Sequence, residues 1–151
     1  MFNQVFADVA DKKGRFALAA IAGMALLLVF MSKVAPVVLG QPMDPAAIVN
    51  KMLGLAEGAS MGTIMHFMLG LVIFPLGYMF YPFRHFPGPQ LARGLLYGVV
   101  LATLAGAVMF PLAGVPMFLG SPKSAVALYM VHLLYTALMA AIIGKPTTQI
   151  S

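Results

Sequence analysis

Two histidines inside long apolar stretches are the residues most able to do chemistry in this sequence. His66 and His132 each lie early in their stretch. At a rise of about 1.5 Å per residue, they would lie roughly 8 and 10 Å from the nearer ends of their helices. Two imidazoles at similar depth on facing helices favour a bis-histidine haem b site, or a quinone head group held between them.

A purely structural interpretation of both histidines stays open beside the cofactor interpretation. A histidine in a membrane helix is often neutral and hydrogen-bonded to a nearby carbonyl or hydroxyl group. Lys33 is the only charged residue within an apolar stretch, and its long side chain predicts an anchor that reaches the membrane surface. Contact between Lys33 and an anionic group of a ligand, such as a haem propionate, is the alternative.

Methionines near the two histidines raise a second hypothesis, a copper site. Met61, Met65 and Met68 follow an i, i+4, i+7 pattern around the first histidine. Met130 lies two residues before the second histidine. Thioethers together with imidazole are ligands that Cu(I) prefers. The favoured interpretation is simpler, because methionine is a flexible filler of apolar contacts between helices.

The scarcity of acidic residues and cysteine excludes several kinds of chemistry. The chain has four acidic residues and no cysteine. All four acidic residues lie outside the apolar stretches, which argues against paired-carboxylate catalysis and against an ion pump with a buried carboxylate. The absence of cysteine excludes disulfides, zinc–thiolate sites and iron–sulfur clusters. We therefore predict no catalytic residue.

The composition places these residues in a membrane protein. Of the 151 residues, 62% are hydrophobic and 9% are charged, and the mean hydropathy is +0.97. A soluble domain carries about 25% charged residues, so this chain could not cover its own surface in water. Although the pI is about 9.8, the composition excludes a nucleic-acid-binding protein.

Four apolar stretches are long enough to cross the hydrocarbon core, which takes roughly 20 residues in a helix. They predict an all-α membrane protein, a single domain over residues 1–151 built as a four-transmembrane-helix bundle. Asp44 followed by Pro45 is typical of a helix start and predicts a short surface helix over residues 45–57. Further prolines predict kinks within the spans. The predicted spans are residues 16–39, 61–83, 95–116 and 125–143.

The distribution of basic residues predicts the orientation of the bundle. Most lysines and arginines lie at one end of the predicted spans. The opposite end holds Lys51 and Lys123, which are offset by Asp44 and Glu57. Both termini are therefore predicted to be cytoplasmic. The basic residues on the predicted cytoplasmic side are Lys12, Lys13, Arg15, Arg84, Arg93 and Lys145.

A ridge of small residues recurs every four positions along the third predicted span. Such a ridge lets two helices approach closely in lipid. We expect it to serve mainly the packing of the bundle, with part of it available to a partner protein. Short similar segments in the two halves of the chain are consistent with a parallel duplication of a two-helix unit. The ridge consists of Gly94, Gly98, Ala102 and Gly106.

Several short motifs are shared with a known group of proteins. They are His66-Phe67 with Gly70, Arg93-Gly94-Leu95-Leu96-Tyr97-Gly98, Pro111-Leu112-Ala113-Gly114, and His132-Leu133 with Tyr135. On these motifs, from about residue 48 to residue 144, the chain resembles an uncharacterised family of small four-span bacterial inner-membrane proteins (a domain of unknown function). The resemblance implies a multi-pass protein of the bacterial inner membrane and transfers no catalytic residue. Thr136 stands where the family pattern leads us to expect glycine.

These observations favour a non-enzymatic function, that of an accessory or stabilising subunit of a larger membrane complex. The expected partners are the lipid bilayer and either a partner membrane protein or a second copy of this chain. Two alternatives stay open. One is a redox protein that binds haem b or a quinone through His66 and His132, and the other is a transporter of a small solute or metal.

Overall fold

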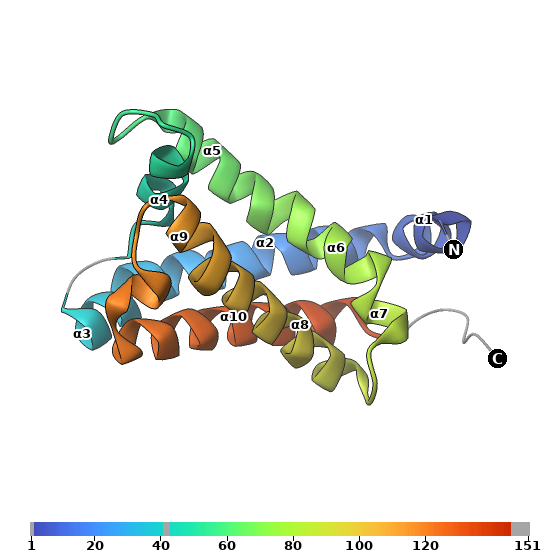
Figure 1. The fold of residues 1–151 in the computed structure, drawn as a ribbon. Helices are drawn as coiled ribbons and strands as arrows, with labels where there is room; N and C mark the ends of the chain where they lie inside the picture. Colours follow the sequence, from blue (N-terminus) through green and yellow to red (C-terminus); the bar gives the residue numbers. More distant parts are fainter. Residues whose placement is uncertain (1, 41–42, 146–151) are drawn as a thin grey trace.

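The fold is a bundle of helices (Figure 1). The computed structural model describes residues 2–40 and 43–145, and every element within these ranges is helical. The prediction of an all-α fold with four long apolar helices is confirmed. The helices that are long and apolar enough to cross a membrane are Lys13–Leu39, Ser60–His85, Gln90–Leu112 and Pro122–Ile143.

Three of the four spans are composite helices, and the fourth is one continuous α-helix. The first span comprises α2 (Lys13–Val29), η1 (Phe30–Val34) and α3 (Ala35–Leu39). The second comprises α5 (Ser60–Met68), η2 (Leu69–Ile73), α6 (Phe74–Phe80) and α7 (Pro82–His85). The third comprises α8 (Gln90–Leu104), η3 (Ala105–Met109) and α9 (Phe110–Leu112), and the fourth is α10 (Pro122–Ile143).

The segments η1, η2 and η3 are π-helical turns, and each ends two residues before a proline, at Pro36, Pro75 or Pro111. In each case the residue before the proline donates its backbone N–H to the carbonyl five residues back. Proline has no N–H and crowds the preceding turn, so the wider π turn accommodates it without breaking the helix. The predicted kinks are therefore located in three spans as π turns followed by proline.

Two helix ends differ from the sequence prediction. The third span ends at Leu112 rather than near residue 116, because Pro111 lies in its last turn and Gly114 turns the chain with φ +67°. The surface helix α4 (Pro45–Met52) is shorter than the helix predicted over residues 45–57. It ends shortly before Gly54, which again adopts φ +67°. Glycine takes this left-handed conformation without the steric penalty that a Cβ atom imposes.

The long helix α10 lies at the centre of the packing and contacts both α8 and α2. The ridge of small residues on the third span faces α10 and the turn before it. A Cβ atom on Gly94 would lie 2.5 Å from the Ala140 Cβ, and one on Gly98 would lie 2.4 Å from the Thr136 Oγ1. At Gly106 it would lie 2.2 Å from the Phe118 ring. The ridge is thus occupied by contacts within this chain.

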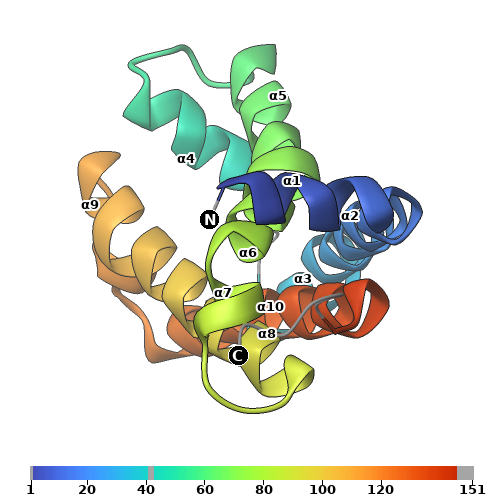
Figure 2. The same cartoon turned by 90° about the vertical axis from the view of Figure 1, so that its right-hand side faces the viewer.

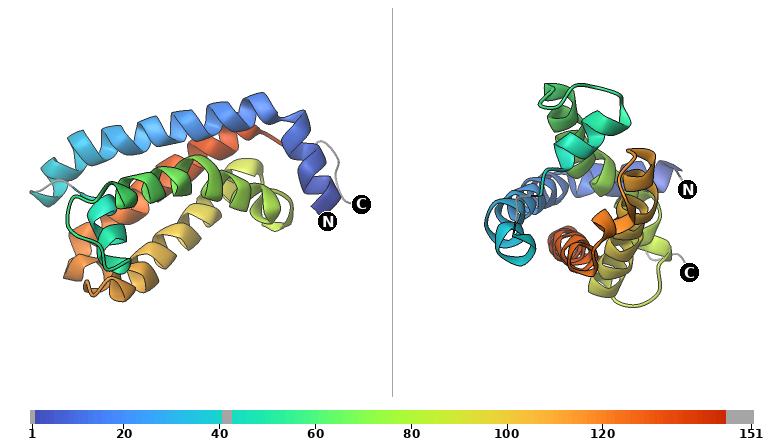
Figure 3. Two further views of the ribbon diagram at one scale, coloured as in Figure 1. Left: turned by 90° about the horizontal axis from the view of Figure 1, so that it is seen from above. Right: turned by 60° about the vertical axis from the view of Figure 1, so that its left-hand side comes forward.

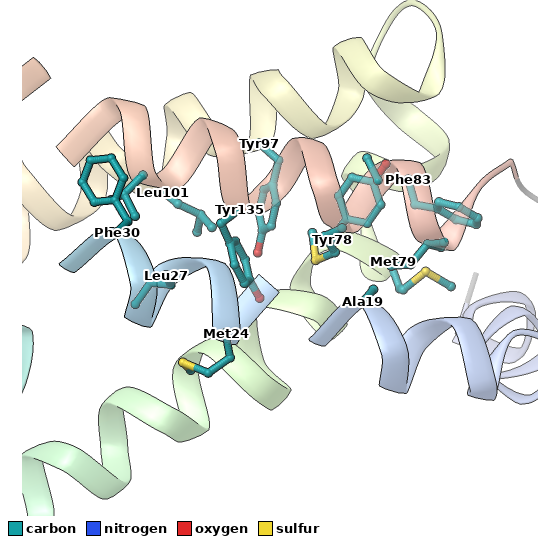
Figure 4. Close-up of a cluster of buried hydrophobic side chains, with 14 of the residues drawn as sticks. Ala19, Met24, Leu27, Phe30, Tyr78, Met79, Phe83, Tyr97, Leu101 and Tyr135 are labelled. Carbon is teal, nitrogen blue, oxygen red and sulfur yellow. The ribbon is translucent and has the colours of Figure 1, made fainter. Parts of the chain in front are cut away.

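Tyr135 of α10 joins the first, second and fourth spans. Its ring packs against Gly23, where a Cβ atom would lie 2.5 Å from the ring. Its hydroxyl donates a hydrogen bond of 2.5 Å to the Gly70 carbonyl in η2. Figure 4 shows the ring projecting from α10 toward the first two spans. Because Phe74 donates to the Leu69 carbonyl and Pro75 has no N–H, the Gly70 carbonyl lacks a backbone donor, and Tyr135 supplies one.

At the end of the bundle that holds α7, the chain is held by buried polar contacts. The helix α1 (Phe2–Asp11) turns away from the axis of α2, as Figure 3 shows, and packs on α6. Asp8 of α1 forms a buried ion pair with Arg84. Arg93 donates to the Phe83 carbonyl at 2.6 Å and to the Gly88 carbonyl at 3.0 Å, so it ties α8 to the preceding loop.

Substituting Gly98→Ala is expected to lower the free energy of unfolding by about 1–3 kcal/mol, the usual cost of overpacking. The new methyl group would also meet the His132 carbonyl at 3.0 Å, and neither backbone nor Thr136 can move away freely. The matched control is Gly14→Ala, where a Cβ atom would find no atom within 4 Å. Unfolding of both variants in detergent micelles measures the difference, and equal stability would contradict this packing.

Substituting Tyr135→Phe removes only the hydroxyl that bonds to Gly70. We expect a loss of about 0.6–1.7 kcal/mol of stability, the range that interhelical hydrogen bonds contribute in membranes. Tyr129→Phe is a control, because its hydroxyl bonds to the exposed Thr103 hydroxyl at 2.8 Å instead of a freed backbone carbonyl. The same unfolding measurement checks the prediction, and a Tyr135→Phe variant as stable as the control would count against it.

Candidate functional site

A cavity of about 440 Å³ lies between the second and third spans, with α4 on one side and α10 at its base. Its volume falls within the range of about 300–1,000 Å³ that is typical of small-molecule sites. Both histidines singled out in the sequence, His66 and His132, line it. The other lining residues are Leu39, Met43, Asp44, Pro45, Ile48, Val49, Met52, Leu69, Phe74, Leu101, Leu104, Ala105, Met109, Phe110, Leu119 and Leu128.

The cavity exists because the second and third spans are close at one end and diverge toward the other. Near their connecting loop, α7 packs on α8. Beyond η2, the helix α5 packs on α4 instead. Figure 2 shows α4 and α5 on one side and α9 on the other. The π turns that precede Pro75 and Pro111 contribute Leu69, Ala105 and Met109 to the lining, so both turns border the cavity.

His66 lies on α5 and is half-buried. Its Nε2 atom is buried and has no hydrogen-bond partner among the described residues. A buried polar atom without a partner costs free energy, so such atoms are rare in native proteins and commonly mark a site that a ligand or water completes.

His132 lies on α10 and has a fixed tautomer. Its Nδ1 atom is 2.8 Å from the Leu128 carbonyl oxygen. Because a carbonyl oxygen only accepts hydrogen bonds, Nδ1 carries the proton and donates. In the neutral ring, Nε2 is then the nitrogen with the lone pair. A hydrogen bond from Nδ1 to a backbone carbonyl is also how proteins orient a histidine toward a metal or ligand.

The rest of the lining is apolar apart from Asp44. The Asp44 carboxylate accepts a hydrogen bond of 3.0 Å from the Ala47 backbone N–H, which is the N-cap that the sequence predicted for the surface helix. Within the part of the chain that the structure describes, no lysine or arginine lines the cavity. The site therefore suits a mostly apolar, uncharged ligand with a small polar group.

Asn50 holds α4 in place beside the cavity, a role that the sequence analysis missed. Its side chain is buried, accepts a 2.7 Å hydrogen bond from the Gly62 N–H, and donates a 2.8 Å bond to the Ala59 carbonyl. It thereby satisfies a free N–H in the first turn of α5 from a different helix. An asparagine among the apolar residues of the predicted surface helix was the available signal.

The structure places the other predicted ligand residues away from this cavity. Lys33 is exposed on η1 and does not line it. The four methionines of the copper hypothesis are also exposed and absent from the lining, namely Met61, Met65, Met68 and Met130. No group of three or more histidine, cysteine, aspartate or glutamate residues is placed to hold a metal ion within residues 2–40 and 43–145. The copper site stays a prediction.

Comparison with known proteins gives no relative from which a function could be transferred. No family model matches the chain, and neither a curated protein nor a solved structure matches it. The resemblance to small four-span inner-membrane proteins therefore stays a prediction, and the argument for function depends on the cavity.

Substituting Asn50→Ala is expected to free α4 from α5, because it leaves the Gly62 N–H and the Ala59 carbonyl unpaired at a cost of about 1–3 kcal/mol. Hydrogen exchange at the Gly62 amide should become faster. Asn50→Asp keeps the acceptor for Gly62 but loses the donor, so its effect should be intermediate. Lys51→Ala, at an exposed position, is the neutral control. Unchanged hydrogen exchange at the Gly62 amide in Asn50→Ala would contradict the role of Asn50 in holding α4 against α5.

Proposed function

We propose that this protein binds a neutral, membrane-soluble ligand of the quinone type in the cavity between His66 and His132. The observation that carries the proposal is the shared apolar cavity with an imidazole from each of two spans. The Nε2 of His66, which has no hydrogen-bond partner among the described residues, supports it further, because a ligand head group would complete its hydrogen bonding. The apolar lining provides the surface for a hydrophobic ring and tail.

A quinone-type ligand fits the lining better than haem b does. Haem carries two anionic propionates, which proteins usually pair with basic side chains or place in water. Among the described residues, the charged member of the lining is Asp44, a carboxylate, and Lys33 lies elsewhere. The fixed tautomer of His132 would suit an iron ligand, so an absorption spectrum of the purified protein is a direct check. A haem Soret band that disappears in His132→Phe would replace the quinone proposal with haem.

The proposed setting is the bacterial inner membrane, with both termini in the cytoplasm. The basic residues at the α1 and α7 end support this orientation through the positive-inside rule. Arg15 of α2 lies near Gly144, which follows α10, so these two helix ends are neighbours.

An accessory role in a larger complex stays a proposal as well, but the ridge on α8 lends it no support because the ridge packs on α10.

The natural absence of cysteine allows a direct test of orientation. Lys123→Cys is expected to react with a membrane-impermeant maleimide applied to intact cells stripped of their outer membrane. Lys145→Cys is expected to react only after the membrane is permeabilised. Both positions are exposed, so the comparison reports sidedness. The reverse labelling pattern would invert the proposed topology.

Binding of decylubiquinone or its reduced form, decylubiquinol, tests the proposed function. Equilibrium dialysis with the protein in lipid nanodiscs should show saturable binding of at least one redox form. The double variant His66→Phe/His132→Phe should weaken it at least tenfold, because each lost hydrogen bond contributes about 1 kcal/mol and tenfold corresponds to 1.4 kcal/mol.

His85→Phe is the matched control for this experiment. His85 lies in α7, stacks on Tyr81 with ring centroids 4.8 Å apart, and does not line the cavity. This variant should bind as the unaltered protein does. Absence of saturable binding, or equal binding by the double variant, would exclude the proposal.

A further inference from the structure

We infer that the cavity selects a ligand whose polar head carries a hydroxyl group, and hence the reduced, hydroquinone form of a quinone-type ligand over the oxidised form. The inference rests on the proposed function, because it concerns the same cavity. The reason lies in the hydrogen-bonding groups of the lining, because some of them already have a partner within the chain.

The Nδ1–H of His132 donates to the Leu128 carbonyl at 2.8 Å. The neutral ring therefore offers only the lone pair of Nε2, which needs a hydrogen-bond donor. A quinone carbonyl is an acceptor, so the two groups cannot form a hydrogen bond. A hydroquinone hydroxyl donates a proton to the same nitrogen and satisfies it.

The remaining polar side chains of the described lining are those of Asp44 and His66. The Asp44 carboxylate accepts hydrogen bonds only, and one of its oxygens already accepts from Ala47. His66 is able to donate or accept according to its tautomer, and its Nε2 has no partner among the described residues. Two of the three polar side chains in the described lining therefore offer only acceptors to a ligand.

The described lining offers few side chains that could donate to a quinone carbonyl. Within the described lining there is no serine, threonine, tyrosine, asparagine, glutamine, lysine or arginine side chain. Among the described side chains a quinone would thus find one imidazole donor at most, and it would cover the His132 Nε2 without giving it a donor. Covering an acceptor without a hydrogen bond is costly, so the oxidised ligand should bind more weakly.

Three ligands with the same ring skeleton and the same tail test the inference in nanodiscs. Decylubiquinol carries hydroxyl donors, decylubiquinone carries carbonyl acceptors, and decylubiquinol dimethyl ether has lost its donors. We expect decylubiquinol to bind about tenfold more tightly than either of the others, a factor equivalent to 1.4 kcal/mol. In His132→Phe the ligands should bind with nearly equal affinity. In His85→Phe the preference for decylubiquinol should persist.

The outcomes separate this inference from the proposed function. If all three ligands bind equally to the unaltered protein and His66→Phe/His132→Phe abolishes binding, the proposed site stands and the selectivity is refuted. If none of the three binds, both proposals fail. A preference for decylubiquinone, or a preference for decylubiquinol that His132→Phe retains, also overturns the inference. The comparison of ligands on the unaltered protein needs no variant to fold.

Discussion

The hydrogen bond from Tyr135 to the Gly70 carbonyl is the interaction on which the arrangement of the spans depends. In lipid, a backbone carbonyl without a donor is costly, because no water is present to satisfy it. Pro75 removes the donor that Gly70 would otherwise have, and the Tyr135 hydroxyl replaces it from another helix. Gly23 provides the space for the tyrosine ring. One side chain of the fourth span thus stabilises the bend of the second span and its packing on the first.

The bends account for the shape of the cavity. The second and third spans each contain a π turn before a proline, and α5 and α9 lie apart while α7 packs on α8. The short helix α4 lies beside this gap and is fixed to α5 by Asn50. Its residues Ile48 and Met52 complete the apolar wall. An imidazole from each of two spans lines the resulting space.

Much of the fold could be predicted from the sequence, because hydropathy and length specify membrane helices almost directly. The depth of His66 and His132 also followed from the helical rise. Whether they face one space could not be predicted, since a π turn inserts an extra residue and rotates the following helix face by about 100°. Tertiary contacts that no local pattern specifies determine three further features. These are the positions of η1, η2 and η3, the early end of the third span and the role of Asn50.

In the proposed complex, His66 and His132 face one occupant of one cavity. The chain has three histidines, so protein labelled with ¹⁵N-histidine gives few imidazole signals, and single His→Phe variants assign them. The most direct measurement is a ¹⁵N NMR titration of this protein in nanodiscs with decylubiquinol. We expect the signals of His66 and His132 to shift together at the same ligand concentration while the signals of His85 stay unchanged. Shifts in only one of the two, or in none, would contradict it.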